Sequence, residues 1–221
     1  RRLRASGWDE GLPTAWQFVH IDVREAPDDV KSNIPAALGA RLVHLGLGKF
    51  PLEYDHYAKK LTSNAAIHPG LGGWLPAADS SQSPPYTGAG QRRAVGRTVA
   101  AAELKAIGDL LDSVTRTMST GDADEELKRL AAHLDADVTV GASNGLAFVV
   151  NSLGGGAGSG SFLDVIQLLR SQSGSSVWLA RPYAVLYAPD VFANLGSSLG
   201  LAGRAAFLQM LIWAFLAGFA E

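Results

Sequence analysis

The sequence predicts an α/β fold, with a mostly parallel sheet flanked by helices. Three apolar runs bounded by turn residues have the length of buried strands: Trp16–Val23, Leu146–Val150 and Tyr183–Ala188. None of them alternates cleanly between apolar and polar residues, and this pattern favours parallel strands that are covered on both faces. Helical patterns lie between the runs, and strands that alternate with helices indicate a parallel α/β sheet.

Helices are expected in four places. Between Val95 and Met118 the apolar residues recur at helical spacing, and the acidic residues early in Asp124–Leu134 suit the positive end of a helix dipole. A third helix is predicted at Glu53–Ala65, and the apolar spacing within Phe162–Leu169 marks a fourth. The rest of Ser32–Gln91 is less regular, and its stretches HPGLGGWLP and SSQSPPYTGAG are typical of loops.

Composition and charge exclude several classes of function. The 221 residues suit one domain or part of a larger one, and an apolar content of 47% allows a sizeable core. With 19 basic and 21 acidic residues, no basic excess points to nucleic acid. The absence of cysteine excludes disulfides, thiolate zinc sites and cysteine nucleophiles, and it fits a reducing compartment. The histidines are scattered singly, so no metal-ligand cluster is predicted.

One apolar run, Ala205–Ala220, is the candidate for a membrane segment. Its 16 residues include Gln209, whereas a helix needs about 18–20 apolar residues to span a bilayer. We therefore expect a buried helix of a globular core and no membrane contact.

The glycine run is the strongest candidate for a binding site. It consists of Gly154, Gly155, Gly156, Ala157, Gly158, Ser159 and Gly160. A buried strand precedes it, and a helix follows whose start is marked by the S-x-x-D pattern of Ser161 and Asp164. Such a unit brings free backbone N–H groups and a positive dipole end to one point, which favours an anion such as phosphate. A tight turn without a ligand is the alternative, and neither a Walker loop nor a dinucleotide fingerprint fits the glycine spacing.

The carboxyl ends of parallel strands meet at one rim of a sheet, where ligands collect. Asp22 ends the first predicted strand, the glycine run follows the second, and Pro189–Asp190 follows the third. Asp22 is suited to accept a hydrogen bond from a sugar hydroxyl or to hold a water on Mg²⁺. It is equally suited to cap a turn, and spacing alone does not decide between these roles.

Several motifs together resemble the tubulin/FtsZ superfamily. The run GGGAGSG is similar to its glycine-rich signature loop, and FVHIDVREAPDDV resembles the second strand of tubulins with its acidic loop. The segment GAGQRRAVGR, Gly88–Arg97, resembles the third phosphate-side loop of FtsZ, and YAVLYAPDVFANLG stands where the fifth strand and its loop belong. The resemblance spans Phe18–Gly196 and is closest to the tubulin-like domains of actinobacterial multidomain proteins.

The resemblance implies a Rossmann-like GTPase domain of a bacterial, cytoplasmic protein that binds guanine nucleotide, GTP or GDP, together with Mg²⁺. The glycine run would hold the phosphates, and Arg97 could face one of them. Self-association into filaments is implied as well, with the acid that activates water supplied by another subunit, so no catalytic residue is assigned. The phosphate side would be closed by Gly88, Ala89, Gly90 and Gln91.

Departures from the family's pattern, among them an acidic loop that is not recognisable, limit what the resemblance implies. The first glycine loop of the family is expected upstream of Arg1, so residues 1–221 are predicted to be a truncated, partial nucleotide-binding domain. Ala157 replaces the usual Thr and removes one hydroxyl that could bond a phosphate oxygen, whereas Ser159 keeps another. A non-hydrolysing filament or interaction module is therefore an alternative function.

A rival from another class is a serine hydrolase with Ser143 as nucleophile. The segment GASNG, Gly141–Gly145, matches the G-x-S-x-G pattern of the nucleophile elbow. That elbow must lead into a helix, and a histidine must follow the serine along the chain. Here a strand-like run follows, and all histidines precede Ser143. The motif is therefore interpreted as a turn.

Overall fold

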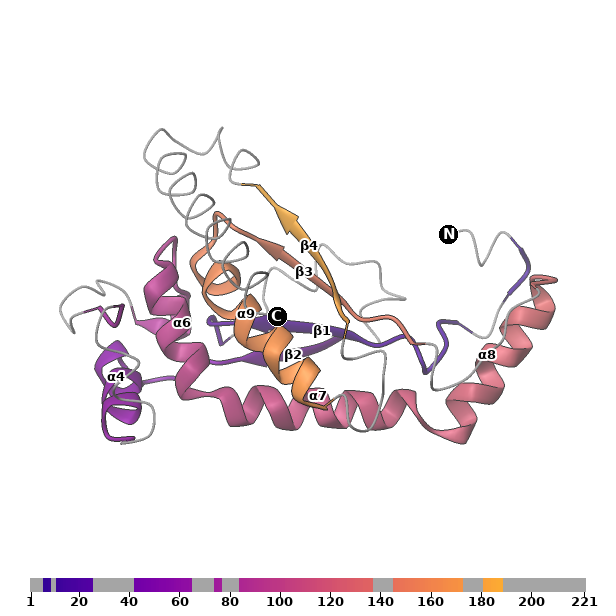
Figure 1. Cartoon of the computed structure of the whole chain (residues 1–221), viewed down its shortest axis with the longest axis horizontal. Helices are drawn as coiled ribbons and strands as arrows, with labels where there is room; N and C mark the ends of the chain where they lie inside the picture. Colours follow the sequence, from indigo (N-terminus) through magenta and orange to yellow (C-terminus); the bar gives the residue numbers. More distant parts are fainter. Residues whose placement is uncertain are drawn as a thin grey trace.

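The computed structural model describes residues 6–8, 11–25, 42–64, 74–76, 84–136, 145–172 and 181–188. Parallel strands combined with packed helices confirm the predicted α/β class (Figure 1). The elements in chain order are β1 (Phe18–Asp22), β2 (Leu42–Gly46), α4 (Tyr54–Thr62), the short 3₁₀ helix η2 (Pro85–Thr87), α6 (Arg93–Ala102), α7 (Leu104–Met118), α8 (Gly121–His133), β3 (Phe148–Ser152), α9 (Gly156–Ser171) and β4 (Tyr183–Tyr187).

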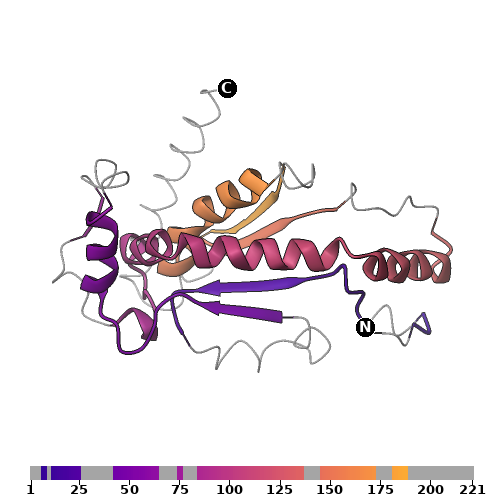
Figure 2. The same cartoon turned by 90° about the horizontal axis from the view of Figure 1, so that it is seen from below.

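The described strands form two parallel pairs. Phe18 of β1 lies opposite Leu42 of β2, and Phe148 of β3 lies opposite Tyr183 of β4. Within the described residues the two pairs share no ladder, so the one sheet that the sequence predicts is divided here into two. Helix α7 runs along the space between the pairs, with β1 and β2 on one side of it and β3 and β4 on the other (Figure 2).

Strand β2 lies within Ser32–Gln91, where the sequence pattern predicts no strand. Its five residues, LVHLG, have His44 at the centre and Gly46 at the end, so their own pattern is weak. The ladder with β1 makes this segment a strand, and Gly46 leaves room for the chain just after β1. A Cβ on Gly46 would lie 2.5 Å from the Cα atom of Glu25, so only glycine lets the chain that leaves β1 pass.

The helix expected across Val95–Met118 is divided into two. Glu103 separates α6 from α7 with φ −111° and ψ 21°, while its N–H still donates to the carbonyls of Val99 and Ala100 at 3.1 Å. The break lets α6 pack against α4 and α9, while α7 runs alongside the strands (Figure 2). Tertiary packing therefore bends a segment whose apolar spacing is continuous.

The main core lies between α4, α6 and α7. Tyr57, Val99 and Ile107 are fully buried there, because each stands on the apolar stripe of its helix. The Tyr54 hydroxyl lies 3.2 Å from the Thr98 Oγ1, so the polar groups inside this core have partners. The helix predicted at Glu53–Ala65 is confirmed as α4.

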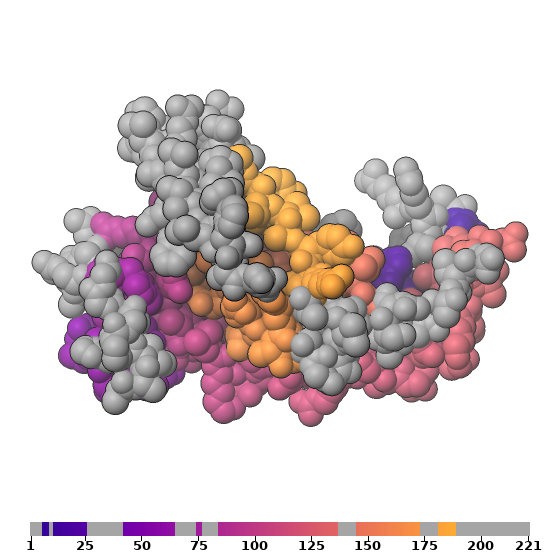
Figure 3. Space-filling view, viewed as in Figure 1, coloured from indigo at the N-terminus to yellow at the C-terminus, as the bar shows by residue number. Residues whose placement is uncertain are grey.

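Coverage on both faces, which the sequence predicts for the strands, is wrong for the second pair. Helix α9 covers one face of β3. The opposite face is apolar and exposed. In space-filling view α9 and β4 lie at the centre of the molecule, above α7 (Figure 3). The bare side chains are between 42% and 60% exposed: Phe148, Val150, Tyr183, Val185 and Tyr187.

The expected features at Ala205–Ala220 and Pro189–Asp190 lie outside the described residues. The helix predicted at Asp124–Leu134 is α8, which begins earlier, at Gly121. Thr120 caps it, because its Oγ1 accepts the N–H of Ala123 at 3.3 Å.

Candidate functional site

The carboxyl ends of β1 and β3 lie at one rim, together with the starts of α6 and α9. Backbone hydrogen bonds join the loops there. The Glu25 N–H, just after β1, donates to the Tyr86 carbonyl at 3.1 Å, and the Gly156 N–H donates to the Gly90 carbonyl at 2.8 Å. Asp22 and the glycine run thus lie at the same rim, as the order of elements predicts.

Helix α9 begins inside the glycine run. Its first residue is Gly156, and Gly155 is the N-cap with extended φ of −88° and ψ of 147°. The predicted helix start at Ser161 is wrong, because Ser161 lies in the second turn and donates its hydroxyl to the Ala157 carbonyl at 2.9 Å. Ser159 in turn donates its hydroxyl to the Gly155 carbonyl. Both serines therefore bond back to the helix.

Three glycines bring α6 and α9 into backbone contact. A Cβ on Gly160 would lie 2.5 Å from the Arg97 nitrogen, and one on Gly156 would lie 2.8 Å from the Gly90 carbonyl oxygen. A Cβ on Gly96 would overlap the carbonyl oxygen of Gly156. Glycine inside a helix costs about 1 kcal/mol relative to alanine, and close packing of the two helices offsets that cost. Gly156 and Gly160 therefore serve the contact between helices.

The first turn of α9 leaves backbone donors unpaired. Among the residues that the structure describes, the N–H groups of Gly155, Ala157 and Gly158 make no hydrogen bond, whereas Gly154 donates to the Ser152 Oγ at 3.2 Å. Unpaired N–H groups and the dipole of a 16-residue helix favour an anion at this point. Gly155 also leaves room, since no atom lies within 4 Å of a Cβ built on it.

The loop before α6 stands beside this turn. Gly88 and Gly90 have φ of 121° and 54°, which glycine adopts without strain. No atom lies within 4 Å of a Cβ on either residue, so their faces are open. Ala89 is buried, and Gln91 is exposed. The loop thus places the N-terminus of α6 next to that of α9.

Asp22 makes a turn contact at the rim. Its Oδ1 accepts the N–H of Arg24 at 3.4 Å, and its backbone carbonyl accepts the N–H of Leu47 at 2.8 Å. The first contact is the capping interaction, and it is long enough to leave the carboxylate available for another donor. A ligand role for Asp22 stays a prediction.

Two arginines of α6, Arg93 and Arg97, lie near its contact with α9. Arg97 lies over the Trp74 ring, 4.9 Å from its centroid, and its Nη2 is 3.8 Å from the Asp164 Oδ1. Burial raises the pKa of Asp164, and the charge of Arg97 opposes that rise. Burial also lowers the pKa of Arg93, and the neighbouring Arg97 adds to the effect. Asp164, which the sequence pattern assigns to a helix start, is therefore a partner of Arg97 between the helices.

Sequence reasoning missed Gly96 and Trp74. Gly96 belongs to the Gly-Arg pair of the GAGQRRAVGR segment, but its contact with Gly156 joins distant parts of the chain. Trp74 stands in a loop rich in glycine and proline, and no local pattern could show that its ring supports Arg97. A glycine in the middle of an amphipathic helix is the one available signal, because such a residue often marks close packing.

Ser143 lies outside the described residues. The segment that follows it is described, and it runs through Gly145–Ala147 into the strand β3. A nucleophile elbow would require a helix there. The context of a serine hydrolase is therefore wrong for this serine.

The fold and the rim define an α/β domain with two helix N-termini gathered at the carboxyl ends of parallel strands. Over residues 1–206 the chain matches the family model described as tubulin like, and it belongs to that family. No curated protein and no solved structure matches the chain. Within the described ranges, no helix is long and apolar enough to cross a membrane, and no group of three or more His, Asp or Glu side chains could hold a metal ion.

Proposed function

We propose that this domain binds guanine nucleotide, GTP or GDP, with the phosphates at the N-terminus of α9. The observation that carries the proposal is the set of unpaired N–H groups on Gly155, Ala157 and Gly158, beside the loop Gly88–Gln91. Phosphate is favoured there because the free N–H groups belong to the N-cap and first turn of one helix, whose dipole has its positive end there. Guanine as the base, and a bacterial cytoplasmic setting, follow from the family resemblance alone.

Within this proposal the members of the glycine run have different roles. Gly155 and the N–H groups of Ala157 and Gly158 contact phosphate, while Gly156 and Gly160 hold α9 against α6. Gly88 and Gly90, in the loop before α6, keep the other side of the phosphate site open. Mg²⁺ would be held chiefly by phosphate oxygens and waters, which suits a rim whose carboxylate is Asp22.

Hydrolysis and assembly are the finer parts of the proposal. Positioning and charge stabilisation of an attacking water would supply the chemistry, with the activating acid from a neighbouring subunit in a filament. Ala157 and the engaged hydroxyl of Ser159 offer no free hydroxyl to a phosphate oxygen, which supports the alternative of a non-hydrolysing filament or interaction module.

The test uses Gly155→Asp in the full-length protein. A Cβ at Gly155 meets no atom within 4 Å and its φ is ordinary, so the fold is expected to persist while the carboxylate repels phosphate. Titration calorimetry with GTP and GDP in Mg²⁺ should show a loss of affinity of about 100-fold or more, roughly 2.7 kcal/mol. Gly156→Asp is uninformative, because its side chain would collide with the loop before α6 and break the contact between helices.

Gly121→Asp is the matched control. Gly121 also begins a helix and also leaves open space for a Cβ, but it lies at α8, away from the glycine run. It should leave the affinity unchanged. Equal affinities of the wild-type and Gly155→Asp proteins, with folding shown by circular dichroism, would overturn the phosphate proposal.

A further inference from the structure

Two histidines that the sequence separates by 24 residues come together on the strand pair β1–β2. His20 and His44 are partners in the parallel register, so their side chains leave the same face of the pair. Their Nδ1 atoms are 2.8 Å apart, and their ring centroids are 4.9 Å apart. The sequence does not show this meeting, because only the ladder between the strands sets it. Two imidazole nitrogens thus face each other across the pair.

The ring of His44 is held in one tautomer. Its Nε2 lies 3.1 Å from the Glu25 carbonyl oxygen, which can only accept a hydrogen bond, so Nε2 carries the proton. The Nδ1 of a neutral His44 therefore presents its lone pair toward His20. A histidine that binds a metal ion almost always donates its other ring N–H in this way, often to a backbone carbonyl. The Glu25 contact is thus an independent sign of a ligand position at Nδ1.

His20 can present a lone pair as well. Burial lowers its pKa, so the ring is largely neutral at neutral pH, and its proton can stand on either nitrogen. Without a metal ion the proton lies on Nδ1, between the two rings, since His44 donates from Nε2. When the same proton moves to Nε2 through water, Nδ1 becomes a ligand and the net charge of the pair is unchanged. The charge of the nearby Asp22 carboxylate favours a cation at His20.

The spacing of the two nitrogens suits a tetrahedral ion. Zinc binds an imidazole nitrogen at about 2.0–2.1 Å, so two nitrogens on a tetrahedral zinc ion are about 3.3 Å apart. The Nδ1 atoms need only separate from 2.8 Å to that distance, which small rotations of the two rings supply. Imidazole ligands suit zinc and its neighbours among the transition metals, whereas Mg²⁺ requires oxygen ligands. The described residues offer no third His, Asp or Glu ligand, so water fills the remaining positions.

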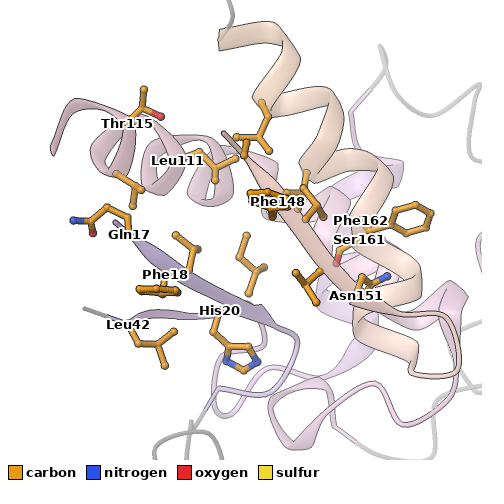
Figure 4. A pocket seen from close by; sticks show the side chains of 18 of the residues that line it. Gln17, Phe18, His20, Leu42, Leu111, Thr115, Phe148, Asn151, Ser161 and Phe162 are labelled. Atoms are coloured by element: carbon orange, nitrogen blue, oxygen red, sulfur yellow. The ribbon is translucent and has the colours of Figure 1, made fainter. Parts of the chain in front are cut away.

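The pair is within reach of an ion from a groove that separates β1 from β3. The groove has a volume of about 540 Å³, with residues of α7 and α9 at its base, and His20 is among the residues that line it (Figure 4). The ring of His20 lies near the carboxyl end of β1, on the side of the strand away from Leu111 of α7. Both histidines are half-buried. An ion can therefore reach the Nδ1 atoms without opening the helical core.

We infer that His20 and His44 bind a divalent transition metal ion of the zinc class through their Nδ1 atoms, with water completing its coordination. The ion replaces the proton between the two rings. Because its ligands stand on paired residues of neighbouring strands, it joins β2 to β1 at the middle of their ladder. The site is separate from the N-terminus of α9 and requires no nucleotide, so it can be tested independently of the proposed function.

The first measurement is a calorimetric titration of the metal-free, untagged full-length protein with Zn²⁺, without nucleotide, at about pH 7.5, above the ordinary pKa of histidine. His20→Gln and His44→Gln should each weaken binding at least about tenfold, since loss of a group that only orients a ligand already costs about 10–100-fold. His56→Gln is the matched control, because His56 is an exposed histidine on α4, and it should leave the affinity unchanged. Excess Mg²⁺ should not displace the zinc. Equal affinities of the wild-type, His20→Gln and His44→Gln proteins, or displacement by Mg²⁺, would overturn the inference.

The second measurement is nitrogen NMR of the histidine rings in the same full-length protein, and it needs no substitution at the pair. Without metal, His44 should show the tautomer that is protonated on Nε2. Zn²⁺ should shift the Nδ1 signals of both His20 and His44 and leave the signals of His56 and His133 unchanged. Zinc that shifts only His56 or His133 would show adventitious binding at the surface, and rings of the pair that do not respond would show no site there. Either result overturns the inference.

Discussion

The α6–α9 contact and the β1–β3 groove lie on different sides of the same helix, and they are built in opposite ways. On one side, Gly156 and Gly160 carry no side chains, and the backbone of α9 meets that of α6 directly. On the other side, Phe162 and Val165 line or border a groove between two strand pairs. The first contact is complete within the described residues, whereas the second has full-sized side chains and unpaired edges. The comparison shows that residues without side chains can mark a packing interface that is already complete.

The largest expected effect on stability comes from adding a side chain to the α6–α9 contact, which is already closely packed. Gly96→Val would place a side chain on the Gly156 carbonyl, and backbone on both sides leaves nothing that can move aside. We expect the free energy of unfolding to fall by about 3 kcal/mol or more, since overpacking is most costly where no side chain can give way. Urea denaturation followed by circular dichroism measures this change.

Gly108→Ala is the control for that substitution. Gly108 lies inside α7, where the nearest atom to a Cβ is the Leu168 Cδ2 at 3.9 Å. Alanine should therefore raise the free energy of unfolding by about 0.5–1 kcal/mol through helix propensity. If Gly96→Val were as mild as Gly108→Ala, the helices would not be in backbone contact.

The next effect compares the same residue type in the two regions. Phe162 of α9 is 5% exposed, and Phe148 of β3 is 59% exposed. In the 221-residue chain, Phe162→Ala should cost about 3 kcal/mol of unfolding free energy, whereas Phe148→Ala should cost less than about 1 kcal/mol, because little buried area is lost. Equal costs, measured in urea, would mean that a contact covers the bare face of β3 and β4 in solution.

The smallest expected effect is on the pH dependence of stability, and it arises in the strand pair β1–β2. Nδ1 of His20 lies 2.8 Å from Nδ1 of His44, across the ladder. Burial lowers the pKa of His20, Asp22 raises it, and His44 lowers it further. The unfolded chain therefore binds a proton at a higher pH than the folded chain does, so stability falls as pH drops below the ordinary value near 6.5.

His20→Gln should make that decline shallower. The measurement is the urea midpoint at several values between pH 7.5 and 5.5, a range chosen to bracket the ordinary histidine pKa of about 6.5. The His56→Gln variant, which changes a histidine on α4 outside the β1–β2 ladder, serves for comparison. If the wild-type and His20→Gln midpoints had the same pH dependence, the folded environment of His20 would not disfavour its charge.

The sequence by itself determined the class of fold, because buried strands and amphipathic helices repeat their apolar residues at different periods. It also placed Asp22 at the end of β1, and the glycine run directly after a strand. The tubulin-like family was recognisable from motifs in the order of the chain. Each of these features depends on short stretches, so local pattern was sufficient.

Only the tertiary structure decided where α9 begins, why α6 ends at Ala102, and that β2 is a strand. Helix α9 starts five residues before Ser161 because the glycines must touch Gly96, a residue distant in sequence. β2 exists through its ladder with β1, and its own five residues carry little pattern. The physical reason is common to all three: backbone contact between distant segments leaves no periodicity of side chains in the sequence, and it outweighs propensities of about 1 kcal/mol per residue.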